Sequence, residues 1–213
     1  MEAVQFTQMK NGTAEDYKFL QVHEIAYAKQ TGERILTALS RLSESFSGYQ
    51  VTRYEHSLQV ATRAWRDGAD QDWVVSALLH DIGDFFAPYD HDKYAALTLR
   101  PFIREQCRWC IAMHGEFQLI YYGQHYDGRN QNKRDRHLGH LFFDDCVDFC
   151  ERWDQASFDP NYDTLPLHFF KPLVSNVFSR HPYDDAIINA VPQPLVNRRL
   201  ASRRAQKTKS LQE

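Results

Sequence analysis

An apolar run that ends in a histidine–aspartate pair is the feature that most constrains this chain. The run Trp73–Leu79 reads Trp-Val-Val-Ser-Ala-Leu-Leu, and His80 and Asp81 follow it directly, two residues before Gly83. In the last turn of a buried helix, neighbouring side chains can point into one cavity, and Gly83 allows the chain to bend away. The pair therefore predicts a buried helix that ends in metal ligands.

Four further residues with the same chemistry are spaced along the chain. They are His56 upstream, His91 and His114 downstream, and Asp154 after a later helix. Any one histidine alone has an equally good explanation as a hydrogen-bonded structural residue, but the set as a whole favours a metal site with open positions. We expect two metals about 3.5–4 Å apart if one carboxylate bridges them. The expected ligands are His56, His80, Asp81 and Asp154 for the first metal, and Asp81, His91 and His114 for the second.

Helical periodicity runs through most of the sequence. Apolar residues recur at helical spacing from 14 to 45, with an interruption at Thr31-Gly32, and this spacing predicts two helices. Further helices are expected over residues 54–68, 70–80, 91–99, 104–114, 142–153 and 165–178. We find no internal repeat, no glycine-rich phosphate loop and no strand alternation, so the predicted fold class is all-α.

Length and charge suggest one domain with a distinct C-terminal end. A chain of 213 residues fits a single domain over 1–197, with its core in 46–180, and no apolar stretch approaches the roughly 20 residues of a membrane span. We expect a cytoplasmic protein. Residues 198–213 carry six basic side chains against Glu213, whereas the whole chain has net charge −3. We expect a flexible basic tail there, in preference to a nucleic-acid-binding segment.

The four cysteines form two close pairs inside predicted helices. Cys107 and Cys110 are three residues apart, and Cys146 and Cys150 are four apart, so each pair lies on one helix face. Binding of zinc by all four is one interpretation. We favour reduced cysteines in the core.

The metal-ligand pattern resembles the HD-domain superfamily of metal-dependent phosphohydrolases, and the two further histidines match its dinuclear members. The run Tyr54-Glu-His-Ser-Leu-Gln59, followed by His80-Asp-Ile-Gly83, is similar to the small bacterial branch that contains mixed-valence di-iron oxygenases cleaving organophosphonates. Myo-inositol oxygenase is a more distant member. The resemblance covers residues 46–155 and implies a compact helical bundle around a dinuclear metal site.

The chain departs from the phosphonate-cleaving oxygenases at positions near the expected substrate. Asp84 and Gln118 stand where those enzymes usually carry His and Lys, and Phe46 and Tyr49 stand where they carry Tyr and Glu. We interpret Asp84, Gln118 and Tyr49 as candidate catalytic residues. The exchange removes cationic donors and adds an anion, which disfavours phosphonate binding in the known mode. Either Arg129, Arg134 or Lys133 supplies the missing charge, or the substrate is neutral or cationic; pairing of Asp84 with an arginine is the alternative interpretation of that residue.

A polar, aperiodic segment at 121–140 is expected to form a loop that borders the cavity. Its candidate substrate-binding residues are Tyr121, Tyr122, Arg129 and Arg134. Solvated arginines and tyrosines packed into a lid are the alternative interpretation of the same residues.

These expectations define two enzyme hypotheses that share six ligands. The first is an oxygenase with two iron ions, in the mixed-valence Fe²⁺/Fe³⁺ state, acting on a small hydroxylated metabolite. The second is a phosphohydrolase of a small phosphate ester or nucleotide that uses Mg, Mn or Zn. A catalytically silent metal-binding or nucleic-acid-associated protein is a third hypothesis, which only the basic tail supports.

Overall fold

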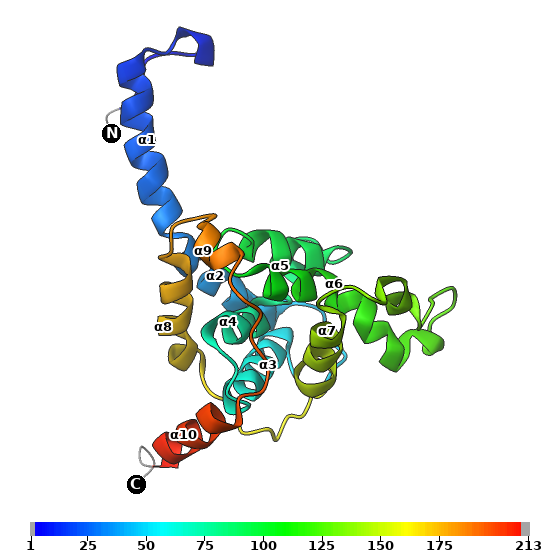
Figure 1. Ribbon diagram of the computed structural model, residues 1–213. Coiled ribbons are helices and arrows are strands. Elements are labelled where there is room, and N and C mark those ends of the chain that lie inside the picture. The colour runs from blue at the N-terminus through cyan, green and yellow to red at the C-terminus, as the bar shows by residue number, and fades with distance from the viewer. Residues whose placement is uncertain (1–2, 210–213) are drawn as a thin grey trace.

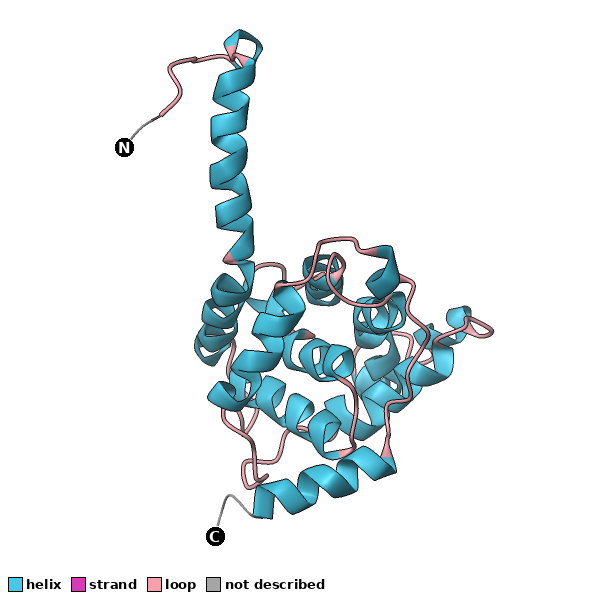
Figure 2. Cartoon of the chain, turned by 60° about the vertical axis from the view of Figure 1, so that its left-hand side comes forward, coloured by secondary structure: helices cyan, strands magenta, loops and turns pink. Residues whose placement is uncertain are grey.

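The computed structural model describes residues 3–209 and consists of helices joined by loops (Figure 2). Residues 3–209 contain no β-strand, so the all-α prediction is confirmed. Figure 1 shows a helical body from which α1 projects. The α-helices are α1 (Ala14–Lys29), α2 (Thr31–Ser40), α3 (Arg53–Arg66), α4 (Gln71–Leu79), α5 (His91–Leu99), α6 (Glu105–Tyr122), α7 (Phe143–Phe149), α8 (Leu167–Phe178), α9 (Asp185–Ile188) and α10 (Arg198–Lys209).

The starts of α3 and α4 are fixed by side-chain caps. Thr52 and Glu55 form a reciprocal capping box at α3, in which the Glu55 carboxylate accepts from the Thr52 backbone N–H at 2.7 Å. Asp70 caps α4 by accepting from the Trp73 backbone N–H at 3.1 Å. Because each cap sets where its helix begins, it also sets which later residues face the interior.

The centre of the body is α4, whose residues 72–79 are all buried. A helix that is apolar on every side belongs in a core. Aromatic rings pack around it: the Trp73 ring centroid lies 6.3 Å from that of Phe149 and 6.0 Å from that of Trp153. The residue after this helix therefore emerges inside the protein, at the junction of α3, α5 and α6.

A π-helical turn follows α7 directly. It spans Cys150–Asp154, and its last residue is the predicted ligand Asp154. π turns are rare and are found frequently at functional sites, because they change the direction of the side chains that follow.

The two ends of the chain differ in how they contact the body. None of the residues of α1 is buried, and the helix stands away from the body in Figure 1. In contrast, α10 lies against α3, where Arg204 stacks over the Trp65 ring at 3.5 Å and donates to the carbonyls of Trp65 and Ala69. A helix therefore occupies 198–209, where we expected a flexible tail. Residues 210–213 of that tail lie outside the described residues.

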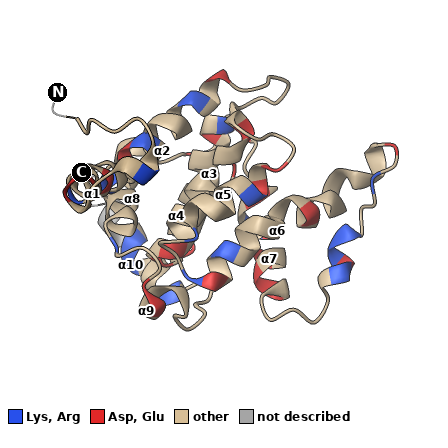
Figure 3. Ribbon diagram, turned by 90° about the horizontal axis from the view of Figure 1, so that it is seen from above, with Lys and Arg blue, Asp and Glu red and all other residues tan. Residues whose placement is uncertain are grey.

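Residues 121–140 are connected to α6 by charged side chains. Helix α6 continues to Tyr122, and 3₁₀ turns follow at Gly123–His125 and Lys133–His137. The buried Glu116 carboxylate lies 3.4 Å from Lys133 Nζ and 3.0 Å from His137 Nε2. Figure 3 shows Lys and Arg gathered on the segment 121–140.

No helix in the described part of the chain meets the length and hydropathy needed to cross a membrane.

Candidate metal centre

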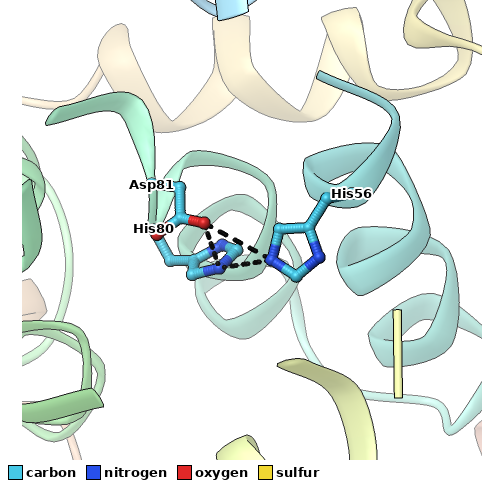
Figure 4. A group of neighbouring side chains, drawn as sticks. All are labelled: His56, His80 and Asp81. Carbon is cyan, nitrogen blue, oxygen red and sulfur yellow. Dashed lines mark hydrogen bonds and ion pairs between the residues drawn. The ribbon is translucent and has the colours of Figure 1, made fainter. Parts of the chain in front are cut away.

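Six predicted ligands from distant parts of the sequence meet at one place in the core. His56 lies in the second turn of α3, His80 and Asp81 follow α4, and Figure 4 shows these three pointing toward one another. Nitrogen and oxygen atoms of the six residues form three overlapping groups, and within each group all atoms lie within 4.8 Å of one another. The groups are His56, His80 and Asp81; His80, His114 and Asp154; and Asp81, His91 and His114.

The two carboxylate oxygens of Asp81 face two different pairs of histidines. Asp81 Oδ2 lies 3.4 Å from His56 Nε2 and 3.2 Å from His80 Nε2. Asp81 Oδ1 lies 3.4 Å from His91 Nε2 and 3.3 Å from His114 Nε2. This division is the arrangement that a bridging carboxylate requires.

Asp154 completes the first group of side chains. Its Oδ1 atom lies 3.3 Å from His56 Nε2 and 3.5 Å from His80 Nε2. Two atoms that each lie about 2.0–2.2 Å from one metal ion are separated by roughly 3.0–3.5 Å. The spacing of these nitrogen and oxygen atoms therefore fits a shared metal ion.

Backbone hydrogen bonds orient three of the four histidine rings. His56 Nδ1 donates to the Ser157 carbonyl at 2.9 Å, His80 Nδ1 to the Ala77 carbonyl at 2.8 Å, and His114 Nδ1 to the Ile111 carbonyl at 2.7 Å. In the neutral ring, donation from Nδ1 leaves a lone pair on Nε2. Each Nε2 lone pair then points toward a carboxylate or another ring, which is unfavourable unless a cation lies between them.

A buried oxygen without a partner further supports the fit to a metal. Asp154 Oδ2 is buried and has no hydrogen-bond donor among the described residues. A buried carboxylate oxygen left unpaired costs free energy, because burial has removed its hydration. The donor set of imidazole nitrogen and carboxylate oxygen suits Fe, Zn or Mn.

The pKa values at the centre indicate a strong demand for positive charge. Burial alone lowers the pKa of His80, but the carboxylates of Asp81 and Asp154 outweigh burial and raise that pKa well above its usual value. Burial raises the pKa of Asp154, but His80 and His56 reverse the shift, and the net pKa lies well below the ordinary one. A bound cation would supply the positive charge that these carboxylates favour.

Gly83 allows the α5 backbone to approach the centre closely. A Cβ atom at position 83 would lie 2.3 Å from the His91 carbonyl oxygen and 2.5 Å from its Cα. These separations are far below a van der Waals contact, so a larger residue would displace His91. Gly83 thus allows His91 to approach the centre, in addition to letting the chain bend after Asp81.

Arg53 is a residue at the centre that sequence reasoning missed. Its Nε donates to Asp84 Oδ2 at 2.7 Å, and its Nη2 donates to Asp81 Oδ2. Burial lowers the Arg53 pKa, but Asp81 and Asp84 outweigh it and raise the pKa. The signal was present in the sequence, since Arg53 lies one helical turn before His56 and the expected ligands included two carboxylates and no cation.

The Arg53 contact changes the electrostatic argument about Asp84. We expected an anion at this position to repel a phosphonate unless it is neutralised, and Asp84 is indeed paired with an arginine, with its side chain only 5% exposed. Burial and the neighbouring Asp81 raise the pKa of Asp84, while Arg53 and His91 act in the opposite direction. The charge of Asp84 is thus no reason by itself to exclude an anionic substrate.

A cavity of about 480 Å³ opens from the metal-ligand cluster to the surface. Its lining includes Asp81, His91, His114 and Asp154 at the inner end, and most of the predicted substrate-side residues. Those are Asp84, Gln118, Tyr49, Tyr121, Tyr122 and Arg129. Arg134 is not among the residues that line it. A volume of this size fits a small-molecule site.

One wall of the cavity is a stack of aromatic rings that ends on a predicted ligand. Phe158 stacks on His56 with ring centroids 4.4 Å apart, and Tyr49 stacks on Phe158 at 4.8 Å. Phe158 was not predicted. It lies four residues after Asp154, and the residue before it, Ser157, provides the carbonyl that accepts from His56.

Comparisons with known proteins agree with this geometry. The sequence profile of the HD domain matches residues 53–139. The chain is 33% identical over 85 residues to the [1-hydroxy-2-(trimethylamino)ethyl]phosphonate dioxygenase (glycine-betaine-forming) of Leisingera caerulea, an alignment that covers 35% of this chain and 43% of that protein. It is 29% identical over 105 residues to the hydroxymethylphosphonate dioxygenase of Gimesia maris, covering 42% of this chain and 52% of that protein. The chain thus spans about half the length of the curated relatives it matches, and the predicted resemblance to the HD domain is confirmed.

Proposed function

We propose that this protein, in which residues 53–139 match the HD domain, is a metal-dependent oxygenase that holds two iron ions and acts on a small hydroxylated metabolite. The observation that carries the proposal is the division of the Asp81 carboxylate between two pairs of histidines. Two relatives whose names are those of dioxygenases support the reaction type. Iron would supply the redox chemistry with dioxygen.

The protein's own side chains would position the reactants. His56, His80, Asp81 and Asp154 would hold the first metal, while His91 and His114, with Asp81, would hold the second. Five of these six ligands, all except His91, are buried, which would limit the access of bulk water to the inner end of the cavity and so protect reactive species from side reactions.

Residues between the ligands and the surface would bind the substrate. Gln118 lies one turn after His114 on α6, and Tyr121 and Tyr122 lie one turn further toward the mouth of the cavity. Burial raises the pKa of Tyr121 to about 12, so its hydroxyl stays protonated at neutral pH and can donate a hydrogen bond. These side chains lie along one face of a rigid helix, which fixes how far a substrate extends from the metals.

The test is anaerobic purification followed by metal analysis and two activity screens on one metabolite panel. We expect about two iron ions per chain and dioxygen uptake with at least one hydroxylated compound. The panel includes hydroxylated phosphonates, because the Arg53–Asp84 pair removes the earlier charge argument against them. A fully loaded protein that contains at most one metal, or that consumes no dioxygen with any compound, would overturn the proposal.

A phosphohydrolase is the second candidate, and one observation favours it. The Arg53 guanidinium lines the cavity next to Asp81, and a fixed cation beside a two-metal site suits a phosphate group. The same panel separates the candidates, since phosphate release without dioxygen uptake would support hydrolysis.

A further inference from the structure

His91 differs from the other three histidines of the centre in what orients its ring. The others donate from Nδ1 to backbone carbonyls, whereas His91 Nδ1 faces the side chain of Asp84, with Oδ1 at 3.5 Å. Its side chain is also 24% exposed, while those of His56, His80 and His114 are at most 3% exposed. His91 is the first residue of α5, so only the helical turn that follows it, and none before it, can support its side chain. The orientation of His91 therefore depends on Asp84.

Asp84 is in turn held by Arg53. The Arg53 Nε–Asp84 Oδ2 bond of 2.7 Å leaves Oδ1 of the same carboxylate directed at His91. The second arm of the guanidinium bonds to Asp81 Oδ2, the oxygen that faces His56 and His80. A planar guanidinium has a fixed fork of donors, so it fixes the relative orientation of the two carboxylates that it joins.

We propose that Arg53 and Asp84 are positioning residues that hold His91 on the second metal and so determine the occupancy of that metal separately from the first. The inference rests on the dinuclear centre of the proposed function. Carboxylates that accept from a metal-bound histidine orient its ring and raise the basicity of the nitrogen that binds the metal. Here Asp84 performs that task for one ligand only, because backbone carbonyls perform it for the other three.

The burial of the pair supports a specific role. Arg53 is 11% exposed and Asp84 is 5% exposed, and a buried ion pair gains little net stability over apolar residues of similar volume. A contribution to stability is therefore a weak explanation for the pair. The pair contacts Asp81 Oδ2 directly through Arg53 and reaches Asp81 Oδ1 indirectly, through His91.

The deciding experiment measures the affinity of each metal separately. The metal-free protein, with the chain of 213 residues intact, is titrated anaerobically with Fe²⁺ by calorimetry, and retained iron is counted after desalting. We expect Asp84→Asn to weaken the second binding event about 10–100-fold while the first changes little. Arg53→Gln should also weaken the second event, and it should affect the first more than Asp84→Asn does, because Arg53 bonds to Asp81 Oδ2 as well. Asp84→Glu, which keeps the carboxylate, should recover part of the lost affinity.

The matched control is Asp72→Asn. Asp72 is a buried carboxylate at the opposite end of α4, paired with Arg180 at 2.7 Å and with Arg104 at 3.6 Å. This variant also breaks a buried ion pair, but it should keep both metal affinities while lowering the unfolding temperature. A structural role for Asp84 would give the same result as the control.

The outcomes separate this inference from the proposed function. A wild-type protein that binds two Fe²⁺ ions, together with Asp84→Asn protein that keeps both affinities or loses both equally, would overturn the positioning role alone. A wild-type protein that binds two metals but takes up no dioxygen would overturn the oxygenase proposal. The two Fe²⁺ affinities of the variants would then still test the positioning role of Asp84. A wild-type protein that binds a single metal would overturn both.

Discussion

Two buried clusters of potential metal ligands lie next to each other in this protein, and only one is arranged to bind a metal. The four cysteines are fully buried between α6 and α7, and three of their thiols donate to backbone carbonyls. Cys110 donates to Phe142 at 3.8 Å, Cys146 to Cys110 at 3.6 Å, and Cys150 to His114 at 3.8 Å. Donation of this kind keeps the thiols protonated, and no candidate metal group among residues 3–209 includes a cysteine.

The histidines show the opposite arrangement. The Nδ1 atoms of His56, His80 and His114 donate outward to backbone carbonyls, and the Nε2 atoms of all four histidines converge on carboxylate oxygens. Both clusters consist of largely buried residues of types that bind metals, so residue type and burial do not distinguish a metal site from a packed core. The direction of the hydrogen bonds makes the difference.

The largest effect that would test this comparison is expected from Asp81→Ala. Because the two Asp81 oxygens face both histidine pairs, the variant should lose both metals, with less than about a tenth of wild-type iron remaining after desalting. Elemental analysis of the desalted protein measures this directly. Retention of one full metal would show that the first group of ligands does not need Asp81.

A second variant separates the two halves of the centre. His114→Ala removes a ligand whose Nε2 lies 3.3 Å from Asp81 Oδ1, the oxygen assigned to the second metal, so we expect loss of the second metal and retention of most of the first. Iron counting together with Mössbauer spectroscopy distinguishes a mononuclear from a dinuclear centre. Equal loss of both metals would indicate one cooperative site.

Sequence reasoning could single out residues that lie close together in the structure because several of them adjoin a strong local signal. His80 and Asp81 end an apolar run, and His56 follows a Thr-x-x-Glu cap that fixes its place on α3. The helical fold class followed from periodicity in the same way. These features depend on neighbours within a few residues, and local sequence patterns report them well.

The parts that sequence reasoning missed depend on contacts between distant segments. The Arg53–Asp84 pair joins residues 31 positions apart, and Phe158 meets His56 across 102 positions. Helix α10 was missed for another reason. Its Arg, Ala, Leu and Lys residues favour a helix, but the high positive charge was given more weight than this propensity, and the packing of Arg204 on Trp65 cannot be seen in the sequence.

Gly83→Ala should affect the centre through the backbone. The added Cβ would meet the His91 carbonyl at 2.3 Å, so we expect the free energy of unfolding to fall by about 1–3 kcal/mol and the second metal to bind more weakly. Denaturant unfolding and Fe²⁺ titration measure the two effects. Unchanged affinity for the second metal would mean that His91 tolerates the displacement.

Cys146→Ala tests the other cluster. The substitution removes one buried sulfur and one weak hydrogen bond, so we expect a loss of about 1–2 kcal/mol in stability and no loss of metal. Denaturant unfolding and elemental analysis of the same preparation give both values. A reduced metal content in the folded variant would contradict our assignment of the cysteines to the core.

The smallest expected effect is the response of the native cysteines to a thiol reagent. Burial raises the pKa of Cys107 and of Cys146 well above the ordinary value, so both stay protonated at pH 7.5 and lack the thiolate needed for attack. Iodoacetamide should label none of the four cysteines in the folded protein and all four after denaturation, as read by mass spectrometry. The raised thiol pKa values also determine how the contribution of these cysteines to the free energy of unfolding changes with pH. An unfolded cysteine loses its proton near pH 8.5, whereas the buried thiols keep theirs, so their contribution is complete below that pH and declines as the pH rises above it. Rapid labelling of native protein at pH 7.5 would show that this cluster is reactive, and the contrast with the histidines would then no longer hold.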